Sequence, residues 1–133
     1  NFGYPKRTAS GFDLNRLNLL IAVIERRTKL RLNDKDIFIN VVGGLRVQDS
    51  AADLAVCLAI ASAIAGRKLA EDFVVFGEVG LGGEIRSAFR PDQRISEAKK
   101  LGFAHAIAPA TVKDKFVIPV KDLRTTLIEY VNE

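Results

Sequence analysis

The fold of this chain is decided by residues 37–66, IFINVVGGLRVQDSAADLAVCLAIASAIAG. The first part of the stretch, 37–42, is rich in β-branched and aromatic side chains and predicts a buried strand. Gly43 and Gly44 predict a corner, because glycine reaches backbone conformations that are closed to other residues. Residues 51–65 then predict a helix whose sequence has almost no polar face.

The predicted helix has recognisable ends. Ser50 is a favourable N-cap, and Asp53 three residues later completes an S-x-x-D capping box. Gly66 is expected to end the helix in the left-handed conformation. A helix that is apolar all round has to be covered on every side. We therefore expect helix 51–65 at the centre of the domain, with the rest of the chain packed around it.

Strands and helices alternate along the rest of the chain, which predicts the α/β class. The predicted strands are 7–12, 73–76, 104–108 and 117–120, and the predicted helices are 14–29, 91–102 and 123–131. Asp13 is the expected cap of the first helix. Strand 73–76 is apolar throughout and is predicted to be buried, whereas Pro119 places its strand at a sheet edge. Residues 77–86 predict a glycine-rich loop that returns as a short strand. Residues 1–6 predict a linker or arm, and residues 1–133 a single domain.

The composition is that of a globular domain with a core and a moderate positive charge. The chain has 133 residues, of which 48% are hydrophobic, and a net charge of +4. Its one cysteine, Cys57, lies within the apolar helix and is expected to be buried and unreactive. Cysteine and histidine do not cluster, and no apolar run is long enough to span a bilayer. We therefore expect no structural zinc site, no membrane contact and a cytoplasmic location. The absence of methionine indicates a fragment of a longer protein.

A few polar residues invite a catalytic interpretation, but each has a simpler one. His105, the only histidine, lies in an apolar strand segment, which favours a hydrogen-bonded structural role over that of a base. Ser50 is better explained as a helix cap than as a nucleophile. Glu78 and Glu84 flank the glycine-rich loop and are expected to be solvated or salt-bridged. The loop lacks both nucleotide-binding glycine patterns, so backbone turning explains it better than phosphate binding.

Basic residues recur from the end of this loop through the following helix. Arg86, Arg90 and Arg94 are spaced four apart, and Lys99 and Lys100 follow them. A solvated surface explains them about as well as a binding role. The run holds a single aromatic residue, so if it binds nucleic acid we expect contacts to phosphates rather than readout of bases.

Four motifs follow one another along the chain: VVGGLRV at 41–47, SAADLA at 50–55, VVFGEVGLGGEIR at 74–86 and ISEAKKLGF at 95–103. Together with KRTASGFDLNRL at 6–17, they closely resemble the C-terminal domain of the RadA (Sms) family of bacterial DNA repair proteins. The resemblance covers nearly the whole chain. It implies a Lon-protease-like fold of the ribosomal protein S5 domain 2-like type, with strands and helices packed around helix 51–65.

The same resemblance indicates that peptidase chemistry is absent. Active Lon domains cleave peptides with a Ser–Lys dyad, and the matching positions here are Ala51 and Asp92. A methyl group cannot attack a carbonyl, and a carboxylate cannot replace the lysine. Ser50 is one residue away, which rotates it by roughly a quarter-turn around the helix axis. We therefore expect a noncatalytic fragment without a functional dyad.

For the parent protein, the resemblance implies an ATP-driven motor that acts on DNA in branch migration during recombination and repair. ATP, Mg and a structural zinc are expected in the parent, and no cofactor in this fragment. The expected partners are further copies of the chain in a ring, most simply a hexamer, single-stranded or branched DNA, and a recombinase filament.

Two alternatives remain open. The first is a Lon-type serine peptidase with a rearranged site that uses Ser50. The second is the Lon-like domain of a magnesium-chelatase-type ATPase linked to competence, which shares the D-L-x-x-A helix and the G-E strand motif. The segment 7–16 argues against this second alternative.

Overall fold

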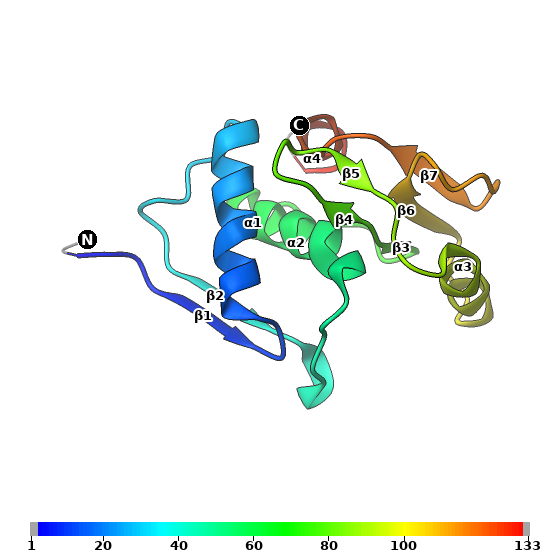
Figure 1. Ribbon diagram of the computed structural model, residues 1–133, viewed down its shortest axis with the longest axis horizontal. Coiled ribbons are helices and arrows are strands. Elements are labelled where there is room, and N and C mark those ends of the chain that lie inside the picture. Colours follow the sequence, from blue (N-terminus) through cyan, green and yellow to red (C-terminus); the bar gives the residue numbers. More distant parts are fainter. Residues whose placement is uncertain (1–2, 132–133) are drawn as a thin grey trace.

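The computed structural model describes residues 3–131, and within them two small parallel sheets lie on either side of one central helix (Figure 1). In the first sheet, β1 (Arg7–Ser10) pairs with β2 (Ile37–Asn40). The second sheet has the order β3 (Phe73–Val75), β6 (His105–Pro109), β7 (Val117–Val120). A short antiparallel hairpin joins β4 (Glu78–Val79) to β5 (Ile85–Arg86). These elements confirm the predicted α/β class.

The helices are α1 (Leu14–Arg27), α2 (Asp53–Ala65), α3 (Pro91–Lys100) and α4 (Leu123–Tyr130). Helix α2 lies between α1, on the side of the β1–β2 pair, and the three-stranded sheet with α3 and α4 (Figure 1). Two 3₁₀ turns, Val42–Gly44 and Ser50–Ala52, connect β2 to α2. None of the helices in the described part of the chain is long and apolar enough to cross a membrane.

Helix α1 forms where the sequence predicts it. The side chain of Asp13 accepts a hydrogen bond from the amide of Arg16 at 2.8 Å, which satisfies one of the unpaired donors of the first turn. Its apolar stripe faces the core and is made of Leu17, Leu20, Ile21 and Ile24, all of them buried. Helix α4 buries Leu123, Leu127 and the following Val131 in the same way.

Helix α2 begins at Asp53, two residues later than predicted, and the 3₁₀ turn Ser50–Ala52 precedes it. Asp49, not Ser50, caps this turn: its carboxylate accepts a hydrogen bond from the amide of Ala51 at 2.9 Å. The Asp53 carboxylate turns away from Ser50 toward a charged partner on α1, so the predicted capping box is wrong. At the other end, Gly66 adopts the expected left-handed conformation, with φ of 67°.

One face of α2 remains open, and this corrects the expectation that the helix is covered on every side. Leu54, Leu58 and Ala61 are fully buried, but Ala59 and Ala63 are exposed. In the described part of the chain, the sheet beside them has two strands, which is too narrow to cover the helix. For the same reason Phe38 of β2 is 63% exposed, although the sequence predicts a buried strand.

The three-stranded sheet follows the predictions more closely. Strand β7 lies at the sheet edge, as Pro119 requires. Strand β3 lies at the opposite edge, and its residues are half-buried instead of fully buried. At the amino end, Asn1 and Phe2 of the predicted arm lie outside the described residues, while the amide of Lys6 donates to the carboxylate of Asp36 at 2.7 Å.

Candidate functional site

The candidate site is the region where the first turn of α2 meets the end of β3. Gly77 follows β3 and bonds this turn in both directions: its amide donates to the carbonyl of Ala51 at 2.8 Å, and its carbonyl accepts from the amide of Leu54 at 3.1 Å. A Cβ on Gly77 would lie 3.0 Å from the side chain of Ile85. Glycine therefore permits this close contact between the sheet and the helix start.

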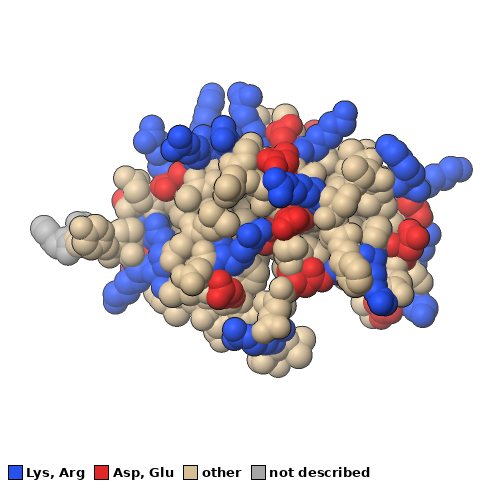
Figure 2. Space-filling model, in the orientation of Figure 1, with Lys and Arg blue, Asp and Glu red and all other residues tan. Residues whose placement is uncertain are grey.

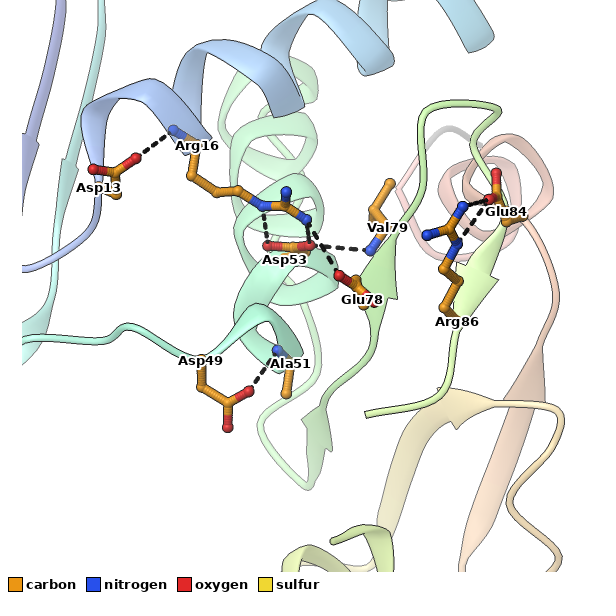
Figure 3. A network of polar contacts seen from close by, with 9 residues as sticks. All are labelled: Asp13, Arg16, Asp49, Ala51, Asp53, Glu78, Val79, Glu84 and Arg86. Carbon is orange, nitrogen blue, oxygen red and sulfur yellow. Dashed lines mark hydrogen bonds and ion pairs between the residues drawn. The ribbon is translucent and has the colours of Figure 1, made fainter. Parts of the chain in front are cut away.

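Asp53 lies at the centre of the site and is fully buried. Its carboxylate accepts two bonds from the guanidinium of Arg16, one of them at 3.1 Å, and a third from the amide of Val79 at 3.1 Å (Figure 3). The hydrogen bond to Asp53 raises the pKa of Arg16. Glu78 lies 3.9 Å from the same guanidinium. These contacts compensate the burial of a charge that would otherwise be costly.

A second ion pair ties the loop before α2 to α3. The guanidinium of Arg94 pairs with one carboxylate oxygen of Asp49, while the other oxygen caps the 3₁₀ turn Ser50–Ala52. The amide of Ala51 and then Arg94 lower the pKa of Asp49. Arg94 also donates to the carbonyl of Phe89 at 2.7 Å and lies 6.0 Å from the ring centre of Phe76. Arg94 is thus held by structural contacts on several sides.

The elements that carry the two predicted dyad positions do meet here, through Asp49 and Arg94. Ala51 itself is 3% exposed, whereas Asp92 is exposed in the first turn of α3. Ser50 is exposed and has no side-chain hydrogen bond among the described residues. Within residues 3–131, no group of three His, Cys, Asp or Glu side chains is arranged to hold a metal ion.

The predicted basic run does not form one continuous face. Arg86 lies in β5 and pairs with Glu84 at 2.6 Å (Figure 3). Arg90 caps α3 with φ of 55°, a left-handed conformation that is unusual for a bulky residue. Its guanidinium lies 5.1 Å from the ring centre of the exposed Phe89. Two of the three arginines, Arg86 and Arg94, are therefore already paired with carboxylates.

The two lysines of the run are more available. Lys99 lies 3.9 Å from Asp114 and 5.5 Å from the ring centre of Phe116. The Lys99 side chain remains partly exposed beside these two contacts. Lys100 is exposed and has no partner in the part of the chain that the structure describes.

A second basic surface lies at the C-terminal end of α1. Lys and Arg gather there along the upper edge of the molecule (Figure 2). Arg26, Lys29 and Arg31 are exposed and form no ion pair within residues 3–131. Cations near the C-terminus of a helix interact favourably with the helix dipole, which gives this group an ordinary structural explanation.

The structure also tests the roles predicted for the two glutamates of the loop, the histidine and the cysteine. Glu78 and Glu84 pair with different arginines, as the salt-bridged interpretation predicts. His105 is exposed at the start of β6 and has no hydrogen bond from its ring among the described residues, so its predicted structural bond is wrong. Cys57 is fully buried, and burial raises the pKa of its thiol, as expected for an unreactive cysteine.

These features define an α/β domain in which ion pairs surround the start of the central helix. A model for the family described as subunit ChlI of Mg-chelatase matches residues 15–112. The match covers more than half of the chain, and the chain belongs to that family.

Curated relatives named DNA repair protein RadA match most of the chain. The protein from Aquifex aeolicus is 47% identical over 109 residues, and the one from Escherichia coli is 52% identical over 106 residues. These matches cover 82% and 80% of this chain but 24% and 23% of the relatives. The protein from Halalkalibacterium halodurans is 43% identical over 119 residues, which are 90% of this chain and 26% of that relative. The predicted resemblance to a RadA region is confirmed, and the chain spans about a quarter of the length of these relatives.

Proposed function

We propose that this chain is a noncatalytic Lon-like domain, of the ribosomal protein S5 domain 2-like type, within a RadA-type DNA repair protein. Its role is to support ring assembly and DNA contact for an ATP-driven branch-migration motor, with ATP, Mg and a structural zinc bound elsewhere in the parent. The identity of about one residue in two with RadA proteins over most of the chain carries this proposal.

The helix start supports the noncatalytic part of the proposal. The position that matches a Lon serine holds the buried methyl group of Ala51, and the position that matches the lysine holds the exposed Asp92. A carboxylate is a much weaker base than the neutral amine of a lysine. The neighbouring charges of Asp49 and Arg94 neutralise each other.

For DNA contact we propose the surface of α3, where Arg90, Lys99 and Lys100 keep more freedom to meet phosphates than Arg86 and Arg94. A ring that moves along DNA has to bind every sequence, and phosphate contacts from flexible cations suit that requirement.

Binding of the chain to fluorescent single-stranded DNA, measured by anisotropy at low and moderate salt, tests the DNA role. Replacing Arg90, Lys99 and Lys100 by alanine should weaken binding alike for all sequences and reduce the salt slope by about one for each lost phosphate contact. Replacing Arg26, Lys29 and Arg31 by alanine removes the same charge and is the matched control. A loss confined to the control variant would move the contact to the end of α1. No binding at low salt would leave assembly as the role of the domain.

Two alternatives have direct tests. A peptidase that uses Ser50 would cleave casein, and the activity would disappear in Ser50→Ala; absence of cleavage discards this alternative. The family model gives weak support to a domain of a magnesium-chelatase-type competence ATPase. The coding sequence on either side of this region distinguishes the two parents.

A further inference from the structure

Among the described residues, the outer edge of β2 has no partner strand. The amides of Ile37 and Val41 donate to the carbonyls of Lys6 and Ser10, at 2.9 and 3.0 Å, on the side of β1. In a strand, successive amides point to opposite edges, so those of Phe38 and Asn40 point away from β1. Within residues 3–131, no strand pairs with this second edge. It therefore presents unused backbone donors and acceptors, which other strands readily bond.

The open edge borders an apolar groove of about 810 Å³ between β2 and α2. Its helical wall consists only of alanine, valine and isoleucine side chains: Ala52, Ala55, Val56, Ala59, Ile60, Ala63 and Ile64. A water-exposed helix face without one polar side chain is unfavourable, because burial of apolar surface away from water stabilises a protein. Backbone bonds at the edge and small apolar side chains in the groove are the two features that strand addition uses.

We propose that a further extended segment of the parent polypeptide, outside residues 3–131, adds to β2 as a strand. Its backbone bonds to Phe38 and Asn40, and every second side chain is apolar and lies in the groove against Ala59 and Ala63. The added strand widens the first sheet and covers the exposed face of α2. This inference is independent of whether the domain contacts DNA.

The parent polypeptide is the favoured occupant for three reasons. The matched region is about a quarter of each RadA relative, so a parent of that size has ample chain to supply a strand. A tethered segment binds at a high effective concentration. A second copy would bring another hollow with the same alanine wall, and two concave surfaces placed face to face leave a void. A two-stranded parallel pair is also a marginal structure without further strands.

Residue-level hydrogen exchange on the full-length parent tests the proposal. We expect the amides of Phe38 and Asn40 to exchange as slowly as that of Ile39, which points toward β1. Ala59→Arg fills the groove with a charge and should release Phe38 and Asn40 while Ile39 stays protected. Ala22→Arg is the matched control: it makes the same substitution at an exposed position of α1, away from the groove. This variant should leave the hydrogen-exchange rates of all three amides unchanged.

Three outcomes would overturn the proposal. The first is exchange of Phe38 and Asn40 at the rate of an exposed loop in the wild-type parent. The second is protection that persists in Ala59→Arg, since the occupant would then not use the groove. The third is protection that disappears on dilution, which would assign the groove to a second copy.

Discussion

Arg16 of α1 and Asp53 of α2 form a two-pronged ion pair that joins the two helices, with the acidic partner fully buried and the basic partner partly exposed. The pair is not a surface contact of little energetic weight. Val79 of β4 donates to the same carboxylate, so one buried charge connects α1, α2 and the β4–β5 hairpin. Removing the arginine alone would therefore leave a buried carboxylate without its charged partner.

Removing Arg16 alone should be costly. Arg16→Met leaves the Asp53 carboxylate buried with one amide donor, and we expect a loss of about 3 kcal/mol in the free energy of unfolding. The double variant Arg16→Met with Asp53→Leu should recover much of this loss, because both charges are then absent. Urea denaturation measures both values. Arg26→Met, on the exposed part of the same helix, is the control and should change stability little; an equal loss in this control would contradict the assignment.

Charge in the core of α2 should prevent folding, whereas charge on its open face should not. Ala61 is fully buried, so Ala61→Asp places an unpaired carboxylate in the core at a cost of several kcal/mol, against a total stability of about 5 to 15 kcal/mol. Ala59→Asp lies on the same helix but is exposed, and we expect a folded chain. Circular dichroism during thermal unfolding distinguishes them. A cooperative transition in Ala61→Asp would show that the helix is packed differently.

Two glycines with nearly the same positive φ allow the cost of that backbone angle to be separated from the cost of steric crowding. Gly11 and Gly43 have φ of 82° and 83°, but a Cβ on Gly11 would lie 2.3 Å from the carbonyl oxygen of Leu45, whereas a Cβ on Gly43 meets nothing within 4 Å. Gly43→Ala should lower the free energy of unfolding by about 1 kcal/mol, because alanine is strained at a positive φ. Gly11→Ala should cost clearly more, because the backbone has to move. Denaturant midpoints of the two variants measure the difference, and equal losses would argue against the close contact.

Asp49 should contribute to acid sensitivity. Its pKa is lowered, first by the bond from the amide of Ala51 and then by Arg94, so folding favours the charged form. The resulting contribution to the free energy of unfolding is fully present above the ordinary aspartate pKa of about 4. It is lost as the pH falls through the lower pKa that Asp49 has in the folded state. Stability should therefore decline less steeply in Asp49→Asn when urea midpoints are measured across the acid range. Asp72→Asn, at an exposed carboxylate, should keep the wild-type slope; an unchanged slope in Asp49→Asn would show that its interactions are too weak to matter.

Local signals in the sequence predicted the elements well. The cap at Asp13, the stripe of α1 and the terminating Gly66 each depend on residues within a turn or two of one another, so their spacing is sufficient. Burial was predicted less well. Whether Ala59 and Phe38 are covered depends on how many strands the sheet has, and this is not a property of their own segment.

The candidate site was predicted only in part. The sequence led to the correct helix start, but the partner of Asp53 is Arg16, 37 residues earlier in the chain. A single acidic residue in an otherwise apolar helix was the signal that a buried partner was needed, and the capping box offered a nearer explanation. Among the basic residues, spacing by four defines a face only inside a helix. Arg86 is in a strand and the backbone of Arg90 has a left-handed conformation. The spacing therefore carried no information about a shared surface.

Complete burial of Cys57 has a practical consequence for spectroscopy. The chain contains no other cysteine, and this thiol is both inaccessible and held in its unreactive protonated form. A fluorophore or spin label attached to a cysteine introduced on the surface would therefore report from that position alone, without prior removal of the native thiol.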